Sequence, residues 1–412
     1  MDTEKFRSEF PALSAEHEGK RPVYFDNACS LLKPKPVIEA VSKYLSENGA
    51  CGGGRSGHLL SQETEEISDG ARKKTAEFLG AGSPSEIIFT NNTSAAVNLA
   101  ARAFPYTKEK NEVVLTVFNH HSSMLPFLEQ QKAGRVEIKI AGMSEDNRFS
   151  PEAVTEMINE KTALVVVPRA SNVTGEVFSL REIIKKARAF GASVLADDAQ
   201  YLGCMREDAA ENGLDMIAFS GHKIGAPTGT GALYCRAGLM KKLISTEVGG
   251  GTVSDVKIEN GRIKASYLPD YRRFEPGIQN YAGQAGLGAA IDFLNKTGKD
   301  AIKDRIMTVS SYCKKQLEEI SQIEMLLPKN SAPTPIVSFY FKDSSILAQD
   351  FNLFLNNELP KEFICIRVGH HCAIPYHAAR GISQSVRLSF FAYNTEKETD
   401  IFISALKQFL GY

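Results

Sequence analysis

Five short apolar runs, each ending abruptly in polar residues, constrain the fold more than any other feature of the sequence. They occupy residues 87–90, 113–117, 164–167, 193–196 and 216–219. Short apolar runs bounded by turn-forming residues are typical of buried strands. Helical stretches recur between these strands, and this alternation predicts a mainly parallel sheet with right-handed crossovers. We therefore expect an α/β fold.

The residues that follow the five strands should lie together, because open α/β sheets bind ligands at the carboxyl ends of their strands. Each residue also has an ordinary interpretation: Thr93 and Ser94 are common helix N-caps, and Lys223 could be a surface lysine in a glycine-rich turn. Loops that are merely exposed to solvent, however, have no need to combine hydroxyl, imidazole, amide, carboxylate and amine groups at successive strand ends. The predicted edge carries Thr93, Ser94, His120, Asn172, Asp197, Gln200, Ser220, His222 and Lys223.

This set of side chains suits pyridoxal phosphate. Lys223 offers the amine for a Schiff base with the aldehyde, and Asp197 offers a carboxylate to keep the pyridine nitrogen protonated. His120 or His121 could lie over the ring. The amides of Asn172 and Gln200 could reach the ring hydroxyl. The donors that could hold the phosphate are Thr93, Ser94, Ser220 and His222.

Composition narrows the alternatives. The chain has 412 residues, 43% of them hydrophobic, and a formal net charge of −1. This balance gives no support for a nucleic-acid or membrane partner, and no apolar run approaches the ~20 residues that span a bilayer. The seven cysteines lack CxxC pairs, so we expect neither a zinc site nor a disulfide framework. An acidic start without an apolar signal core leads us to expect a cytoplasmic protein.

Three motifs carry a resemblance to a known family. They are Phe219-Ser220-Gly221-His222-Lys223, Phe274-Glu275-Pro276-Gly277 and Arg367-Val368-Gly369-His370-His371-Cys372-Ala373. With them, the chain resembles the class V aminotransferase superfamily of fold type I pyridoxal-phosphate enzymes, and within it the SufS-like cysteine desulfurases and selenocysteine lyases. The resemblance extends from residue 24 to residue 395. It implies that Lys223 forms the Schiff base, that Asp197 rather than Asp198 faces the ring nitrogen, and that His120 stacks on the ring.

The resemblance also implies roles around the substrate. Cys372 would take the sulfur, and its neighbour in sequence, Arg367, favours the nucleophilic thiolate. Arg387 would bind the substrate α-carboxylate, because a guanidinium fork suits a carboxylate. His58, in the glycine-rich loop of residues 51–58, would lie near the substrate, together with Asn172 and Arg367.

The implied activity is that of a cysteine desulfurase, which converts L-cysteine to L-alanine and holds the sulfur on Cys372 as a persulfide. Such sulfur would supply iron–sulfur cluster assembly or another sulfur-transfer pathway. A homodimer and a small sulfur-acceptor protein are the implied partners. The alternatives are a selenocysteine lyase, an aminotransferase, a C–S β-lyase, or a sulfur carrier without turnover.

The expected organisation has three parts. An N-terminal segment (1–20) packs with a small α+β C-terminal domain (296–412), and a large cofactor-binding domain (21–295) lies between them. In the small domain we expect residues 363–368 to form one strand. The chain departs from the family pattern at four places near the substrate pocket or subunit interface: Cys29-Ser30 for Ala-Thr, Asn91-Asn92 for Arg-Gly, Thr252 for Glu, and Ile278 for Thr.

Overall fold

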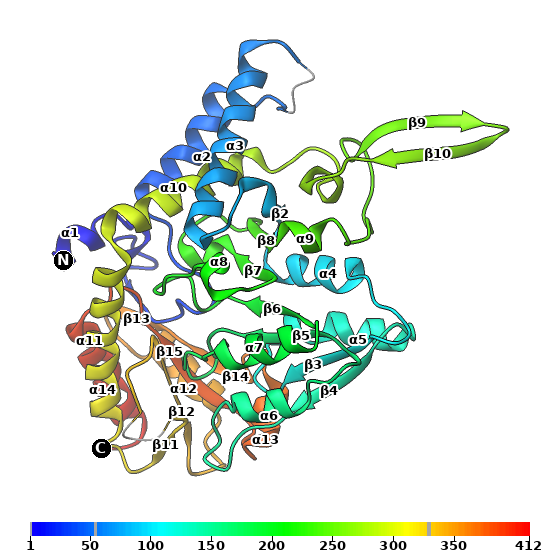
Figure 1. Ribbon diagram of the computed structural model, residues 1–412. Helices are drawn as coiled ribbons and strands as arrows, with labels where there is room; N and C mark the ends of the chain where they lie inside the picture. Colours follow the sequence, from blue (N-terminus) through cyan, green and yellow to red (C-terminus); the bar gives the residue numbers. More distant parts are fainter. Residues whose placement is uncertain (1, 53–55, 328–330) are drawn as a thin grey trace.

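A seven-stranded sheet forms the centre of the computed structural model, which describes residues 2–52, 56–327 and 331–412. The strand order is β2-β8-β7-β6-β5-β3-β4 (Figure 1). Strands β4, β3, β5, β6 and β7 run parallel, whereas β8 is antiparallel to both of its neighbours. The expected α/β fold with a mainly parallel sheet is confirmed. The strands are β2 (Ile87–Thr90), β3 (Glu112–Thr116), β4 (Glu137–Ala141), β5 (Thr162–Pro168), β6 (Ser193–Asp197), β7 (Met216–Ser220) and β8 (Gly231–Cys235).

The inner strands of the central sheet are buried on both faces, which explains why they are continuous apolar runs, whereas the edge strand β4 is partly exposed. Along β5, Val165 and Val167 pack in one hydrophobic cluster with helix α7, and Leu164 and Val166 pack in another with helix α4. This alternation is the two-residue period of a strand. The helices of this region are α4 (Thr93–Ala103), α5 (Leu125–Lys132), α6 (Pro151–Glu156), α7 (Arg181–Ala189), α8 (Ala209–Asn212) and α9 (Ala237–Met240).

A second, antiparallel sheet of four strands lies beside the first, in the order β11-β12-β15-β14 (Figure 1). Helix α10 leads from the central sheet into α11 beside this second sheet. The elements are α10 (Tyr281–Thr297), α11 (Lys299–Leu317), β11 (Ile323–Met325), β12 (Ile336–Phe341), α12 (Ala348–Asn357), β14 (Arg367–Gly369), α13 (Ile374–Ala379), β15 (Ser385–Ser389) and α14 (Glu396–Phe409).

The segment expected to be one strand, residues 363–368, is two strands that break at Ile366. β13 (Glu362–Cys365) pairs in parallel with β1 (Arg21–Tyr24), and β14 pairs with β15. The prediction of a single strand is therefore wrong, because the two halves bond to different partners. Near the N-terminus, the Phe10 ring lies 4.7 Å from that of Tyr393, so the N-terminal segment packs against the loop that follows β15.

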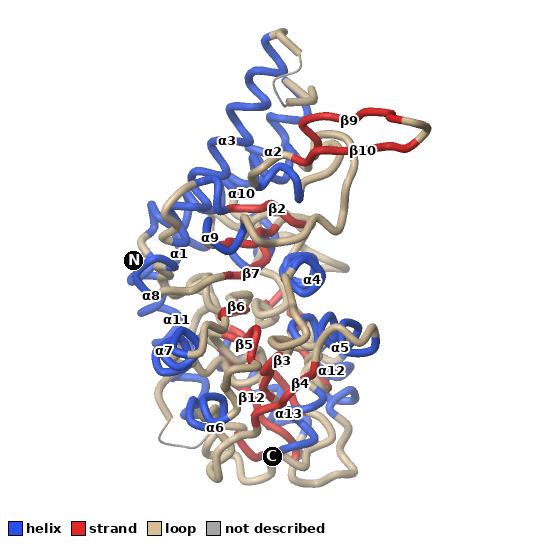
Figure 2. The backbone as a smooth tube through the Cα atoms, turned by 45° about the vertical axis from the view of Figure 1, so that its right-hand side comes forward, coloured by secondary structure: helices blue, strands red, loops and turns tan. Residues whose placement is uncertain are grey.

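Two projections leave this body (Figures 1 and 2). One is the helix pair α2 (Lys35–Glu47) and α3 (Leu59–Leu79), which packs on α10. The other is the hairpin of β9 (Val253–Glu259) and β10 (Arg262–Tyr267), whose side chains are almost all exposed. Residues 53–55 of the predicted glycine-rich loop lie outside the described residues.

Shorter elements complete the described chain. They are α1 (Thr3–Arg7) and the 3₁₀ turns Pro11–Leu13, Pro84–Glu86, His121–Ser123, Gly221–Ile224 and Tyr271–Phe274. None of the helices in the described ranges combines the length and the apolar character needed to cross a membrane.

Candidate active site

A cavity of about 310 Å³ opens at the carboxyl edge of the central sheet, against the second sheet. Polar groups from five strand ends meet there with residues that follow β1, β13 and β14. The cavity brings together twelve of the residues predicted from sequence: Thr93, Ser94, His120, Asn172, Asp197, Gln200, Ser220, His222, Lys223, Arg367, Cys372 and Arg387. His58 is not among its lining residues. It is exposed at the start of α3, where its Nδ1 accepts a hydrogen bond from Ser61 N (3.1 Å).

Lys223 lies in the 3₁₀ turn that follows β7. Burial lowers the pKa of its amine from 10.5 to about 8; Asp197 opposes this effect and Arg387 adds to it. The turn requires a glycine, since a Cβ at Gly221 would lie 2.2 Å from Thr230 Oγ1. A fixed turn therefore presents an amine of which a far larger fraction is neutral and nucleophilic near neutral pH than in an ordinary lysine.

Asp197 ends β6, and its buried carboxylate accepts hydrogen bonds from Ser123 Oγ and from Ala199 N (3.1 Å). The next residue, Asp198, does not line the cavity. Burial, and then the nearby Glu207 carboxylate, raise its pKa well above the usual range. Of the two carboxyl groups, Asp197 is thus the one that can present a negative charge to a ligand.

A cradle of hydroxyl groups lies at the start of helix α4. Ser220 Oγ accepts from Thr93 N (2.8 Å) and lies 2.7 Å from Thr93 Oγ1. Ser94 Oγ donates to Ser122 Oγ (2.6 Å). Ser122 is not among the residues predicted from sequence. The free N–H groups and dipole of a helix N-terminus favour an anion, so this arrangement suits a phosphate group.

His120 lies in the cavity as a neutral imidazole. Burial, and then the Lys223 ammonium, lower its pKa to about 4. Its Nδ1 accepts from Ser122 N (3.1 Å), which leaves the proton of the neutral ring on Nε2. The adjacent His121 N donates to Cys372 O (2.9 Å). A backbone hydrogen bond therefore joins the loop of His120, the predicted ring-stacking residue, to the loop of Cys372, the predicted nucleophile.

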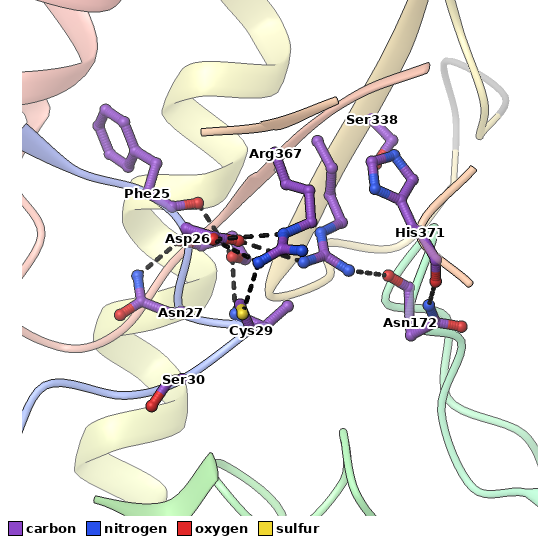
Figure 3. A network of polar contacts seen from close by, with 12 residues as sticks. Phe25, Asp26, Asn27, Cys29, Ser30, Asn172, Ser338, Arg367 and His371 are labelled. Carbon is purple, nitrogen blue, oxygen red and sulfur yellow. Dashed lines mark hydrogen bonds and ion pairs between the residues drawn. The ribbon is translucent and has the colours of Figure 1, made fainter. Parts of the chain in front are cut away.

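Two arginines share one carboxylate on the opposite side of the cavity (Figure 3). Arg387 Nη2 lies 3.3 Å from Asp26 Oδ1, and its Nη1 donates to Asn172 O (2.8 Å). Arg367 Nη2 lies 3.2 Å from Asp26 Oδ2 and also donates to Cys29 Sγ. Arg387 is 3% exposed, and its Nε is buried without a partner among the described residues. Such a buried, partly unsatisfied guanidinium is suited to bind a carboxylate.

Sequence reasoning did not assign roles to Asp26, Cys29, Ser122, Ser123 and His371 in this site. Asp26 and Cys29 follow β1 and face Arg367, more than 330 residues later. No local pattern could reveal that pairing. For Ser122 and Ser123 a signal did exist, since both follow the predicted strand at 113–117.

Comparison with known proteins identifies the family. The model of the family described as Aminotransferase class-V matches residues 23–402. The chain belongs to the class-V aminotransferase family. Among its relatives, a probable cysteine desulfurase of Streptomyces coelicolor is 34% identical over 416 residues, 99% of this chain and 97% of the relative. A probable cysteine desulfurase of Borreliella burgdorferi is 33% identical over 407 residues, 98% of this chain and 95% of the relative.

Solved structures of similar proteins agree with this family fold. The cysteine desulfurase CsdA of Escherichia coli, in an S-sulfonic acid form, superposes with a TM-score of 0.89 at 26% identity, covering 100% of this chain and 99% of that one. An apo cysteine desulfurase of Thermococcus onnurineus gives a TM-score of 0.88 at 30% identity, covering 99% and 98%. The class-V fold therefore extends over the whole chain.

Proposed function

We propose that this class-V enzyme is a pyridoxal-phosphate-dependent cysteine desulfurase, which converts L-cysteine to L-alanine and retains the sulfur on Cys372 as a persulfide. One observation carries the proposal: a buried amine of lowered pKa and an exposed thiol, Lys223 and Cys372, face the same cavity. The names of the relatives support the same activity. An aminotransferase would need the amine but would have no use for the thiol.

The residues of the cavity fit pyridoxal phosphate. The hydroxyl cradle of Thr93, Ser94 and Ser220 at the start of α4 suits its phosphate, and the buried Asp197 carboxylate suits its pyridine nitrogen. Lys223 would hold its aldehyde covalently. When bound, the cofactor makes the Cα proton of an amino acid acidic by accepting its electron pair.

The side chains of this chain would carry out the remaining work. Arg387 binds and orients the α-carboxylate of L-cysteine. The neutral amine of Lys223 would take the Cα proton, and the Asp197 carboxylate would hold the ring nitrogen of the cofactor. His120, neutral and with its proton on Nε2, can donate a hydrogen bond from Nε2 within the cavity.

Sulfur transfer balances without an outside oxidant. The Cys372 thiolate attacks the substrate sulfur, an S–S bond forms, and the substrate C–S bond breaks. The electron pair of that bond stays on carbon, which takes up a proton and becomes the methyl group of alanine. The transferred sulfur is oxidised to the sulfane level, and the carbon is reduced. The persulfide would then pass to a small acceptor protein, and we propose a homodimer as the working form.

The test compares the parent enzyme with Cys372→Ser on L-cysteine plus a reductant, with alanine, pyruvate and sulfide quantified. We expect the parent to form alanine and sulfide in equal amounts, and the variant to lose most of both while still binding the cofactor. Cys51→Ser is the matched control, because Cys51 is exposed and lies outside the cavity. Cys372→Ser turnover at the parent rate would refute the role of this thiol, and pyruvate as the product would indicate a β-lyase.

A further inference from the structure

A second thiol faces the same cavity. Cys29 follows β1, more than 340 residues before Cys372, and both line the cavity with Lys223. Neither cysteine is in a disulfide. The proposed chemistry uses Cys372 alone, so the position of Cys29 calls for a separate explanation.

The backbone around Cys29 is held on both sides by the loops that carry the catalytic groups. Gln200 Nε2 donates to Ala28 O (2.8 Å), and Leu31 N donates to His222 O (3.0 Å). Cys29 N itself donates to Asp26 O (3.0 Å). The backbone at Cys29 is therefore held beside the loops that follow the neighbouring strands β6, which ends at Asp197, and β7, which precedes Lys223.

The Cys372 backbone is anchored to the same edge of the central sheet. Asn172 Nδ2 donates to His371 O (2.6 Å), and His121 N donates to Cys372 O (2.9 Å). Both thiols thus belong to one assembly, although they come from opposite ends of the sequence.

Figure 3 shows the Arg367 guanidinium beside Cys29, where it donates hydrogen bonds to both the sulfur and the Asp26 carboxylate. Lys33, Lys223 and the buried Arg387 also act electrostatically with Cys29. Reactive cysteines are typically found in partly exposed surroundings that supply cationic hydrogen-bond donors of this kind.

Other cysteines of the chain show the opposite environment. Cys204, Cys235 and Cys313 are buried, and burial raises the pKa of each thiol, that of Cys204 to about 11. These three are inert core residues. Cys29 differs from them in facing a cavity and in receiving a hydrogen bond from a guanidinium.

We propose that Cys29 is a second sulfur-carrying residue, which accepts the terminal sulfur of a Cys372 persulfide. This inference rests on the proposed function. The Cys29 thiolate attacks the outer sulfur, a new S–S bond forms on Cys29, and the Cys372 S–S bond breaks. Cys372 leaves as a thiolate, so the step is an exchange without net oxidation or reduction. The persulfide extends the reach of Cys372 by about 2 Å, the length of one S–S bond.

The test omits added reductant and acceptor protein and measures the first burst, before the thiol of free L-cysteine removes sulfur from the chain. The cofactor-loaded parent should release about two equivalents of alanine per chain in a burst, and Cys29→Ala about one, because each persulfide retains one sulfur. Cys51→Ser should keep the parent amplitude. Alkylation followed by peptide mass spectrometry of the parent should find the added sulfur on both Cys29 and Cys372, a measurement that needs no variant to fold.

Each outcome bears on one proposal or both. Alanine with added sulfur on Cys372 alone, and a one-equivalent burst in the parent, would overturn the Cys29 proposal and leave the proposed function intact. Absence of alanine from the parent would overturn both. Added sulfur on Cys29 in Cys372→Ser would also refute the transfer, because it would show that Cys29 takes sulfur directly from the substrate.

Discussion

The reactivity of Lys223 should depend on pH in a way set by its burial. With a pKa of about 8, roughly a quarter of the amine is neutral at pH 7.5, against about one part in a thousand at the ordinary value of 10.5. The neutral fraction is therefore about 200-fold higher than for an exposed lysine, and the rate at which the apoenzyme captures an aldehyde should follow that fraction as the pH changes. The rate should rise with pH, pass its midpoint near pH 8, and level off about one pH unit above the pKa, where roughly nine-tenths of the amine is neutral.

Two substitutions should move this curve in opposite directions. Asp197 stabilises the ammonium form, so Asp197→Asn should shift the midpoint to lower pH. Arg387 destabilises that form, so Arg387→Met should shift the midpoint to higher pH. Comparison among variants removes any pH dependence that belongs to the aldehyde itself.

The assay measures the capture rate of pyridoxal 5′-phosphate by the apoenzyme from pH 6.5 to 9.5 by absorbance, with borohydride trapping and peptide mapping of the modified lysine. Lys33 supplies a built-in control, since burial also lowers its pKa to about 8 and it remains in Lys223→Ala. A midpoint near 10.5, or a shift of Asp197→Asn to higher pH, would refute the electrostatic reasoning.

Three further predictions concern binding, stability and the turn. Arg387→Lys should lower kcat/KM for L-cysteine about 100-fold, mainly by raising KM, because an ammonium cannot bind a carboxylate through two parallel hydrogen bonds as a guanidinium does. The 100-fold loss corresponds to about 3 kcal/mol of binding free energy. Arg72→Met should lower the free energy of unfolding by about 3–5 kcal/mol, because it leaves the buried Glu275 carboxylate, now 2.8 Å from Arg72, without its partner. Urea unfolding measures this loss, and far-UV circular dichroism follows it because the chain has no tryptophan. Gly221→Ala should abolish most activity, since its Cβ would displace the turn that carries Lys223.

Each of these has a clear contrary result. An unchanged KM in Arg387→Lys would show that Arg387 does not bind the substrate α-carboxylate. The double variant Arg72→Met with Glu275→Gln should lose less stability than the two single losses added together, and simple additivity would contradict coupling of the pair. Gly70→Ala is the control for the turn, because its Cβ would meet nothing within 4 Å; equal activity in both glycine variants would contradict the steric argument.

The central sheet and the strand-end residues could be predicted because both signals are local. A buried parallel strand is an apolar run, and its ligand-binding residues follow directly after it, as Asp197 follows residues 193–196. The antiparallel orientation of β8 and the exposed strands β9 and β10 gave no comparable signal. The hairpin side chains contact no core that would require their apolar residues, such as Ile258 and Ile263, to be inside.

The remaining site residues depend on contacts between distant parts of the chain. The break at Ile366 exists because β13 bonds to β1 and β14 bonds to β15, and neither partner is close in sequence. For the same reason, Asp26 and Cys29 became candidates only once Arg367 was placed beside them. For His58, the family resemblance implies a role near the substrate, and that role stays a prediction. In the structure, His58 lies at the N-terminus of α3.

The pairing of β1 with β13 has a consequence for biosynthesis. Residues 21–29 emerge from the ribosome early, yet their hydrogen-bonding partners at 362–365, Arg367 and residue 389 are translated near the end. A nascent chain can complete its central sheet first but must wait for its last fifty residues to close the pocket. The two cavity thiols, Cys29 and Cys372, therefore come together only after the partners of residues 21–29 have been synthesised.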